Sequence, residues 1–533
     1  MRPRTVVPQP LEAVADRITE TVGAASVPGV PALRDSASPL VGGVTLRAQE
    51  TRRGDLFAAL PGAHAHGADH AATALAQGAA AVLTDAAGAA RPAVRDAGVP
   101  VLVHDDPRAA LGPASALVYG DPSTRPGGVG VLGVTGTSGK TTTVYLLEAA
   151  LAAAGATMGL IGTIETRIGG ERAPSAFTTP EAPDLQALLA VMVERGVSHA
   201  AMEVSSHALA LERVAGTRFA VGAFTNLSPE HLDFHADMEA YFAAKARLFD
   251  GRAAAEVVCA DARWGRRLVT DGTVTVTPDL GAPDLKVSDP TGTATDWRAA
   301  DVVAHPDGTQ TFRALGPGVA LPVTLHLPGA FNVVNALLAL ACGTAAGFDP
   351  GLLAGGLATV RVPGRMQRIE AGQDFLAVVD YAHKPAAVGA LLTALRTQAR
   401  GPRARGRVLT VLGCGGDRDR AKRPVMGRLA AELSDALWVT DDNPRSEDPA
   451  TIRAAVLEGA RAVPDEQRAE IHEQGDRRAA IGEAVAAARP GDVVVVAGKG
   501  HETGQKVGDT TFPFSDADEV RGALDRVLGG GRR

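Results

Sequence analysis

Residues 129–155 read VGVLGVTGTSGKTTTVYLLEAALAAAG and combine a buried-strand pattern, a glycine-rich loop and an apolar helix that ends at Gly155. Gly136 and Gly139 allow backbone N–H groups to turn inward, and the start of the helix adds a dipole that favours an anion. In such a loop Lys140 reaches the β and γ phosphates of a nucleotide, and the Thr141 hydroxyl can ligate magnesium. The stretch therefore predicts a nucleotide-phosphate site between a strand and a helix.

The loop is a variant of the common phosphate-loop pattern. The usual spacing requires a glycine five residues before Gly139, where this chain has Val134, and Gly133 lies one place earlier. A plain glycine-rich turn in a hydrophobic core is the alternative interpretation. The coincidence of strand, loop, Gly-Lys-Thr and helix favours the phosphate site.

Strands and helices alternate along the rest of the chain, which predicts an α/β protein with parallel, doubly wound sheets. Before the loop, apolar runs occur at 79–85 and 99–105, and after it further buried strands are expected. Residues 272–327 differ, since short Thr/Val runs broken by Gly and Pro predict an antiparallel excursion. In the last part, strands are expected within 375–382, 407–415, 435–442 and 492–500, with helices at about 385–399, 421–433, 449–461 and 476–488.

Two Pro- and Gly-rich breaks, at 121–130 and 362–364, divide the chain. We expect three domains at 1–128, 129–362 and 363–533. A chain of 533 residues has the length for three or four domains of roughly 150 residues each.

Composition excludes several classes of protein. Apolar residues make up 45% of the chain, which argues against disorder. The 53 basic and 60 acidic residues give a net charge of -7, which argues against a dedicated nucleic-acid binder. No apolar run approaches the ~20 residues of a membrane span, and the first ten residues do not resemble a signal peptide. Three isolated cysteines without a CxxC pair fit a reduced, cytoplasmic setting.

Lysine is rare in this chain: only seven of the 53 basic residues are Lys. A lysine is therefore more informative here than usual, because Arg cannot replace it where chemistry needs a neutral amine. Lys245 lies on a predicted helix after the sequence NLSPEHLDFH at 226–235, and a surface position is its alternative interpretation. Glu203 and His231 each follow a predicted strand, so both converge on the phosphate loop if the strands are neighbours.

Nine motifs in order resemble the Mur ligase family, which joins a carboxylate to an amine with ATP. They are GDLFAALPG at 54–62, GTSGKTT at 136–142, MEVSSH at 202–207, NLSPEHLDFH at 226–235, PGRMQRI at 363–369, DYAHKP at 380–385, GCGGDRDRAKRP at 413–424, TDDNPR at 440–445 and AGKGHE at 497–502. The resemblance covers the chain nearly end to end. It implies that the first domain, 1–128, binds a UDP-sugar substrate, that the second, 129–362, binds ATP, and that the third, 363–533, is a Rossmann-like domain that binds an amino acid. Folylpolyglutamate synthase, a relative, fits less well, because DNPR and the 54–62 motif are similar to the Mur branch.

The resemblance implies roles for residues that match the family motifs. ATP binding is implied for Gly136, Thr137, Ser138, Gly139, Lys140, Thr141, Thr142, Asn332, Asn335, Arg365 and Asp380. Magnesium binding is implied for Thr141, Glu203, His231 and a carbamylated Lys245. A UDP-sugar peptide is implied to contact Leu46, Ala48, Ala63, His64, Ala65, Thr178, Thr179, Ser205 and Arg213, and diaminopimelate to contact Arg418, Asp442, Asn443, Pro444, Arg445, Gly498 and Glu502. The catalytic set is then Lys140, Glu203, His231 and Lys245.

The implied activity is an ATP-dependent amide ligase of peptidoglycan synthesis that acts as a cytoplasmic monomer. Its substrates would be a UDP-N-acetylmuramoyl dipeptide and diaminopimelate, joined through an acyl phosphate, with meso-diaminopimelate favoured over the LL isomer. No residue is assigned as the base that deprotonates the amine. A paralogous ligase with another acceptor or amino acid, and a phosphate-loop ATPase that is not a ligase, are the alternatives.

Two positions depart from the family pattern. Ala48 stands where a serine usually touches the uridine diphosphate, and Leu211 stands where some members have a substrate-binding glutamine. One neutral hydrogen bond contributes about 1 kcal/mol, so binding can survive the loss of the serine. Other motif residues have structural interpretations as well: Asn332 as a helix cap, Arg365 as a linker charge, DNPR as a turn and AGKGHE as a loop that closes a strand.

Overall fold

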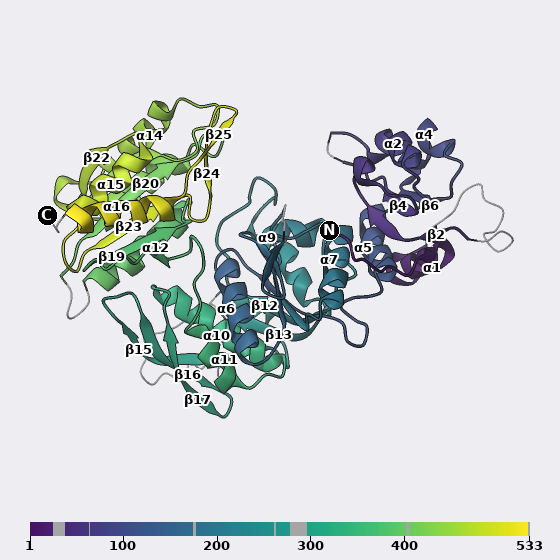
Figure 1. Ribbon diagram of the computed structural model, residues 1–533, viewed down its shortest axis with the longest axis horizontal. Helices are drawn as coiled ribbons and strands as arrows, with labels where there is room; N and C mark the ends of the chain where they lie inside the picture. The colour runs from purple at the N-terminus through teal and green to yellow at the C-terminus, as the bar shows by residue number, and fades with distance from the viewer. Residues whose placement is uncertain are drawn as a thin grey trace. The chain divides into compact units, whose positions relative to one another are not determined.

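The computed structural model describes residues 1–24, 38–62, 64–173, 177–260, 263–277, 296–400 and 405–530. These residues form an α/β protein with parallel sheets (Figure 1), which confirms the predicted fold class. The chain packs as two compact units, Met1–Thr275 with Ala341–Asp349, and Val276–Leu340 with Pro350–Arg533. The division into domains after residues 128 and 362 stays a prediction. No helix among the described residues is long and apolar enough to cross a membrane.

The N-terminal part of the first unit contains a four-stranded parallel sheet in the order β3-β4-β5-β6. Its strands are β3 (Gly43–Thr45), β4 (Asp55–Ala58), β5 (Ala81–Thr84) and β6 (Val101–Val103), and a short antiparallel pair joins β1 (Gln9–Pro10) to β2 (Leu40–Val41). The helices are α1 (Leu11–Val22), α2 (Ala71–Ala76), α3 (Ala86–Ala89), α4 (Pro92–Arg95) and α5 (Pro107–Val118), with 3₁₀ turns η1 (Ala48–Glu50) and η2 (Gly67–His70). The apolar runs predicted at 79–85 and 99–105 become β5 and β6.

The phosphate-loop strand lies inside an eight-stranded sheet of order β10-β9-β8-β11-β7-β12-β13-β14. Strand β7 pairs in parallel with β11 on one side and β12 on the other. The strands are β7 (Gly130–Thr135), β8 (Met158–Ile161), β9 (Thr166–Ile168), β10 (Glu171–Ala173), β11 (His199–Glu203), β12 (Phe219–Phe224), β13 (Ala253–Cys259) and β14 (Val274–Val276). The helices are α6 (Lys140–Ala153), α7 (Ala182–Glu194), α8 (Ser206–Ala210) and α9 (Met238–Ala246), with 3₁₀ turns η3 (Arg247–Phe249) and η4 (Gly265–Leu268).

A three-stranded antiparallel sheet follows, as the Thr/Val runs predicted. It consists of β15 (Arg298–Ala304), β16 (Gln310–Gly316) and β17 (Val319–Leu325). Part of the expected excursion, residues 278–295, lies outside the described residues. The chain continues into α10 (Ala330–Ala345) and α11 (Pro350–Leu357).

The C-terminal sheet has six strands in the order β18-β19-β23-β20-β21-β22, all parallel except β18. The strands are β18 (Gln367–Arg368), β19 (Leu376–Asp380), β20 (Val408–Cys414), β21 (Ala436–Asp441), β22 (Glu470–Glu473) and β23 (Val493–Ala497). Helices α12 (Pro385–Ala399), α13 (Lys422–Leu433) and α14 (Pro449–Arg461) share one apolar core with the sheet. Helices α15 (Arg477–Ala487) and α16 (Asp516–Gly530) share a second core, so the sheet is doubly wound.

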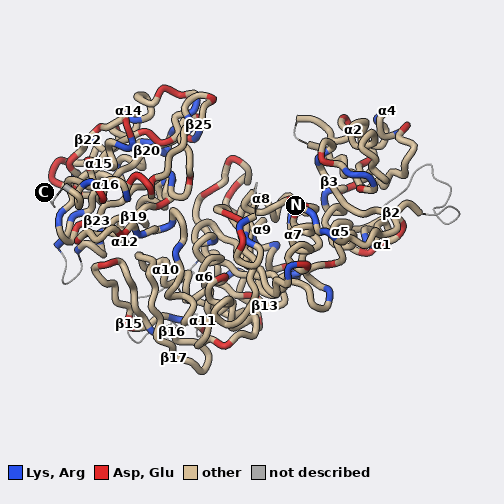
Figure 2. Tube along the Cα trace, in the orientation of Figure 1, with Lys and Arg blue, Asp and Glu red and all other residues tan. Residues whose placement is uncertain are grey.

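The predicted helices and the four main strands of this region are confirmed, whereas its other elements were not predicted. These are the strands β18 and β22, the helix α16, the antiparallel hairpin of β24 (Gly504–Val507) and β25 (Thr510–Pro513), and a short 3₁₀ turn, η5, at Asp465–Gln467. Basic and acidic residues are interspersed in both units (Figure 2), as their near balance in the sequence implies.

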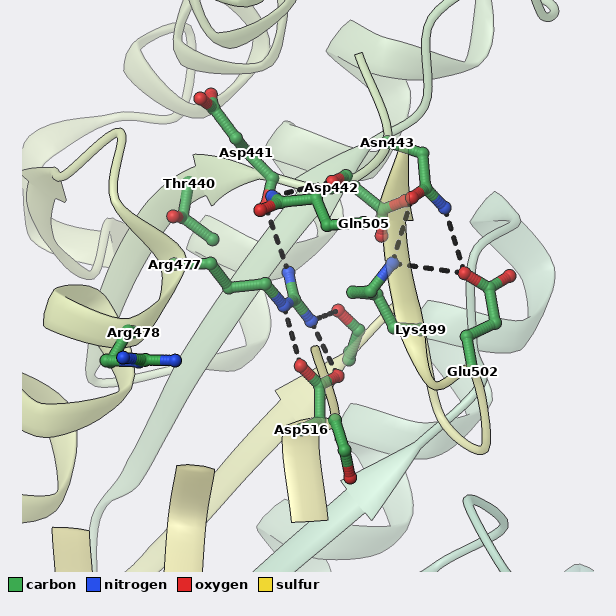
Figure 3. A network of polar contacts seen from close by, with 12 residues as sticks. Thr440, Asp441, Asp442, Asn443, Arg477, Arg478, Lys499, Glu502, Gln505 and Asp516 are labelled. Atoms are coloured by element: carbon green, nitrogen blue, oxygen red, sulfur yellow. Dashed lines mark hydrogen bonds and ion pairs between the residues drawn. The ribbon is translucent and has the colours of Figure 1, made fainter. Parts of the chain in front are cut away.

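A buried ion pair joins the starts of α15 and α16. The side chains of Arg477 and Asp516 are both 0% exposed, and Nε and Nη2 of Arg477 donate to the two carboxylate oxygens at 2.7 and 2.8 Å (Figure 3). Nη2 also donates to the carbonyl of Ala497 at 3.1 Å, at the end of β23. The pair therefore ties two helices to the carboxyl edge of the sheet.

Replacing Asp516 by Ala should lower the free energy of unfolding by about 3–5 kcal/mol, because it leaves a buried guanidinium without its counter-charge. Glu519→Ala is the matched control, since Arg478 and Glu519 join the same two helices with a largely exposed arginine. That change should cost at most about 1 kcal/mol. Urea unfolding of both variants measures the difference, and equal losses would contradict the assignment.

Candidate functional site

The phosphate loop connects the end of β7 at Thr135 to the start of α6 at Lys140. Gly139 has φ 89°, and Gly136 has φ 144°, with room for no side chain: a Cβ there would lie 1.9 Å from Oγ1 of Thr225. Nζ of Lys140 donates to the carbonyls of Gly136 and Thr137, each at 2.9 Å. A lysine and the first N–H groups of a helix thus meet at one point, which suits an anion.

Glu203 ends β11 and reaches the start of α6. Its Oε2 accepts a hydrogen bond from Oγ1 of Thr141 at 3.0 Å, and its Oε1 accepts one from the backbone N–H of Thr163 at 2.8 Å. The residue is 1% exposed. The expected convergence of Glu203 and His231 was conditional on β11 and β12 being neighbours, and this condition is not met, because β7 lies between them. The two strands flank the phosphate-loop strand, so their carboxyl ends lie on either side of the loop.

Lys245 lies on α9 and is 1% exposed, so the surface interpretation of this lysine is wrong. Its Nζ donates to the carbonyl of Gly136 at 2.8 Å and lies 4.5 Å from the ring centre of Tyr241. Burial, and then the charge of Lys140, lowers the pKa of Lys245 well below its usual value. This lysine is therefore a buried amine that loses its proton far more easily than a lysine in water.

His231 follows β12 and has a left-handed backbone, with φ 56°. Burial, and then the charges of Lys140 and Lys245, lowers the pKa of His231. A lowered pKa favours the neutral imidazole, the form that can ligate a metal.

The donor types around the loop fit magnesium only together with further ligands. Among the described residues, no group of three or more His, Cys, Asp or Glu side chains could hold a metal ion alone. Magnesium prefers oxygen and commonly combines one or two carboxylates with substrate phosphates. Thr141 and Glu203 supply a hydroxyl and a carboxylate in contact, which fits that pattern.

Four residues with an expected role at the UDP-sugar peptide gather near Glu203. Oγ1 of Thr179 donates to the backbone carbonyl of Glu203 at 2.8 Å and accepts from the N–H of Ser205 at 3.2 Å. Nη1 of Arg213 donates to the Thr179 carbonyl at 3.4 Å, and Thr178 shares a hydrogen bond of 3.1 Å with Thr163. The Thr179 hydroxyl is thus fixed by the end of the strand that carries Glu203.

The remaining residues of that set lie in the N-terminal sheet region. Ala48 is 3% exposed and packs in an apolar cluster with Phe57 and Ala59, which an alanine suits. Leu46 packs partly buried against a second cluster, and His64 and Ala65 lie in the loop after β4. Ala63 lies outside the described residues. The role of these positions stays a prediction.

In the second unit, Asn332 and Asn335 lie inside α10 and are buried. Asn332 lies past the start of the helix, and its Nδ2 donates to the carbonyl of Pro328 at 2.7 Å. The alternative interpretation of Asn332 as a helix cap is therefore wrong. The guanidinium of Arg365 lies 4.2 Å from the ring centre of Tyr381. Burial raises the pKa of Asp380, against the opposing effects of Arg365 and two backbone N–H groups.

The DNPR turn follows β21 and holds Arg445 in a fixed position. Arg445 has φ 52°, and its N–H donates to the Lys506 carbonyl of the β24 strand at 3.0 Å. Its Nη1 donates to the Gly416 carbonyl at 2.7 Å, and a Cβ on Gly416 would lie 1.9 Å from the carbonyl oxygen of Pro444. Arg418 lies in the same loop as Gly416 and is exposed. The turn is thus part of a packed loop pair and not an isolated Asn-Pro turn.

Glu502 and Gly498 follow β23 and lie beside the same turn. Nδ2 of Asn443 donates to Oε2 of Glu502 at 2.8 Å, and a Cβ on Gly498 would lie 2.7 Å from Oδ2 of Asp442. Lys499, to which the sequence analysis gave no role, joins this group and is fully buried (Figure 3). The rarity of lysine in the chain was the available signal for it.

Comparisons with known proteins agree along the chain. The Mur ligase family, catalytic domain, matches residues 41–119, the Mur ligase middle domain matches 134–343, and the Mur ligase, glutamate ligase domain, matches 364–500. The chain is 52% identical over 482 residues, 89% of each chain, to the UDP-N-acetylmuramoyl-L-alanyl-D-glutamate–2,6-diaminopimelate ligase of Corynebacterium glutamicum. It is 49% identical to the protein of that name from Streptomyces coelicolor, over 99% of each chain.

Two further similarities extend this result. The chain is 43% identical to a UDP-N-acetylmuramyl-tripeptide synthetase of Leifsonia xyli subsp. xyli, over 91% of each chain. A solved structure of a UDP-N-acetylmuramoyl-L-alanyl-D-glutamate–2,6-diaminopimelate ligase superposes with a TM-score of 0.66 at 30% identity, covering 92% of this chain and 96% of that one. The phosphate loop, the two flanking strand ends and the DNPR turn thus occur in a chain that belongs to the Mur ligase family of ATP-dependent ligases.

Proposed function

We propose that this ligase joins diaminopimelate to UDP-N-acetylmuramoyl-L-alanyl-D-glutamate in peptidoglycan synthesis. The observation that carries the proposal is the DNPR turn, in which Lys506 and Gly416 hold Arg445 while Asn443 bonds to the half-buried carboxylate of Glu502. An arginine fork suits a carboxylate, and Glu502 suits an ammonium, so the pair suits the far end of diaminopimelate. Relatives at 52% and 49% identity carry the name of this activity. ATP and a UDP-linked precursor as substrates fit a cytoplasmic reaction.

The proposed reaction has two steps. An oxygen of the D-glutamate side-chain carboxylate attacks the γ phosphorus of ATP, and the bond to the ADP oxygen breaks to leave an acyl phosphate. The neutral amine of diaminopimelate then attacks the acyl carbon, the nitrogen gives up one proton to water, the carbon–oxygen bond to phosphate breaks, and phosphate leaves. Lys140 neutralises charge that spreads over the transferred phosphoryl oxygens.

Thr141 and Glu203 are proposed to hold one magnesium ion, and His231 and Lys245 a second. Bound magnesium would neutralise phosphate charge during the transfer. Lys245 as an ammonium would repel such an ion. Its neutral amine can instead attack the carbon of carbon dioxide and release a proton, which gives a carbamate whose single negative charge is shared by two oxygens. The burial of Lys245 and its position beside Lys140 support this proposal, because both favour the neutral amine.

A paralogous ligase with another amino acid is the second candidate. The alanine at position 48 motivates it, and so does the Leifsonia relative, whose name leaves the amino acid open. Whether the enzyme takes meso- or LL-diaminopimelate depends on the far stereocentre, and meso-diaminopimelate remains the proposal.

Lys140→Ala should lower kcat by at least about 100-fold, since loss of one preorganised electrostatic contact commonly costs about 10²–10³. The fold should persist, because the lysine is partly exposed and its side chain is not part of a hydrophobic core. Ligation rate and thermal unfolding of the same preparation test this. Near-normal turnover in a folded variant would overturn the phosphate-loop assignment.

Lys245→Ala should abolish ligation, and a short-chain carboxylic acid should restore part of it by supplying the missing anion in the space that the side chain leaves. Bicarbonate alone should not restore activity, because the amine that would bind carbon dioxide is gone. The rate of product formation with and without the acid is the measurement. Lys140→Ala serves as the control, since the same acid should not rescue it, and an absence of rescue in Lys245→Ala counts against the carbamate.

Arg445→Ala should raise the Michaelis constant for diaminopimelate by about 30-fold to several thousand-fold, because loss of one side of a buried charged contact costs about 2–5 kcal/mol. The Michaelis constant for ATP should stay nearly unchanged. Arg445→Lys is the matched variant that keeps the charge but loses the two parallel donors. Product mass with diaminopimelate and with lysine identifies the amino acid, and wild-type use of both, or unchanged selectivity in Arg445→Ala, would contradict the proposal.

A further inference from the structure

Lys499 is a fully buried lysine at the candidate amino-acid site. Its side chain is 0% exposed, and its Nζ donates to Oδ1 of Asn443 at 3.0 Å and to Oε2 of Glu502 at 3.1 Å (Figure 3). A buried ammonium is costly unless it is paired and hydrogen-bonded. Glu502 supplies the counter-charge, and its side chain remains 34% exposed. The buried cation is thus tied to a carboxylate that still reaches solvent.

The ammonium fixes which way the Asn443 amide faces. An ammonium only donates hydrogen bonds, so Asn443 must turn its oxygen toward Lys499 and its NH₂ group away. The same oxygen accepts the backbone N–H of Lys506 at 2.8 Å, and Nδ2 donates to Oε2 of Glu502 at 2.8 Å. Both ends of the amide are therefore used, and the amide holds Glu502 in one orientation.

One oxygen of Glu502 is left for a ligand. Oε2 receives hydrogen bonds from both Asn443 and Lys499, whereas Oε1 accepts none from the residues that the structure describes. Lys506 also links this carboxylate to the arginine of the turn, since its N–H bonds to Asn443 and its carbonyl accepts the N–H of Arg445. Lys506 of β24 thus connects Arg445 to Asn443, and through Asn443 to Glu502.

We propose that Lys499 is a positioning residue that holds Asn443 and Glu502 so that Oε1 of Glu502 receives the ammonium at the non-reacting end of the incoming amino acid. This assignment rests on the proposed function and names a residue through which its selectivity operates. Lys499 acts through Glu502 and does not touch the reacting atoms. Its loss should weaken recognition of the far ammonium and leave recognition of the far carboxylate intact.

The test compares diaminopimelate with 2-aminopimelate, which keeps the far carboxylate but lacks the far amine. Lys499→Met removes the ammonium and keeps the apolar stem. It should raise the Michaelis constant for diaminopimelate at least about tenfold and leave those for 2-aminopimelate and ATP within about twofold, since only the charged contact is lost. Arg521→Met is the matched control, because it removes an exposed cation on α16 to which no role at the amino-acid site is assigned, and it should change none of the three.

If Lys499 had a purely structural role, its loss would weaken the binding of both amino acids alike. Equal increases in the Michaelis constants for diaminopimelate and 2-aminopimelate, or no change in the constant for diaminopimelate, would therefore overturn the proposal. If Lys499→Met does not fold, Lys499→Gln replaces it, because glutamine removes the charge at a similar length. The same changes in the three Michaelis constants are expected. Failure of the proposed function is recognised separately, because wild-type enzyme would then form no product with diaminopimelate, and that result would remove this assignment as well.

Discussion

The candidate active site depends on one carbonyl oxygen, that of Gly136, which accepts hydrogen bonds from two lysine side chains. Gly136 can turn its carbonyl toward both because it has no side chain, and Nζ of Lys140 and Nζ of Lys245 lie 2.9 and 2.8 Å from that oxygen. Two ammonium groups that bind the same oxygen repel each other, and the repulsion is strong where water is excluded. Burial, and then the charge of Lys140, lowers the pKa of Lys245. The loop thus combines a lysine for phosphate with a second amine that readily becomes neutral.

Buried charges also organise the C-terminal sheet, but there each has a partner. Arg477 is paired with Asp516 and bonds to the end of β23, and Lys499 is paired with Glu502 beside the DNPR turn. The first pair fixes the helices against the sheet edge, and the second fixes the side chains that would meet a ligand. A paired buried charge gives a precise orientation at little net gain in stability, which is useful where recognition depends on geometry.

Much of this arrangement was predictable from the sequence, because local patterns determine it. The phosphate loop, the strands β19, β20, β21 and β23 and the helices between them follow from apolar runs and glycine spacing. The order of the strands could not be predicted, because it depends on pairing between distant parts of the chain. In the structure β7 lies between β11, which ends at Glu203, and β12, which precedes His231. The short polar strand β22 and the exposed hairpin of β24 and β25 lack an apolar signal. The burial of Lys245 and Lys499 depends on tertiary packing, which a lysine alone does not reveal.

The central claim, that Lys245 is a neutral amine available to form a carbamate, is open to direct observation. Enzyme equilibrated with ¹³C-labelled carbon dioxide near neutral pH is examined by ¹³C NMR, beside Lys245→Ala under the same conditions. The account predicts a carbamate resonance in the wild-type enzyme that is missing from the variant. An active wild-type enzyme without that resonance, or an identical resonance in both proteins, would contradict it.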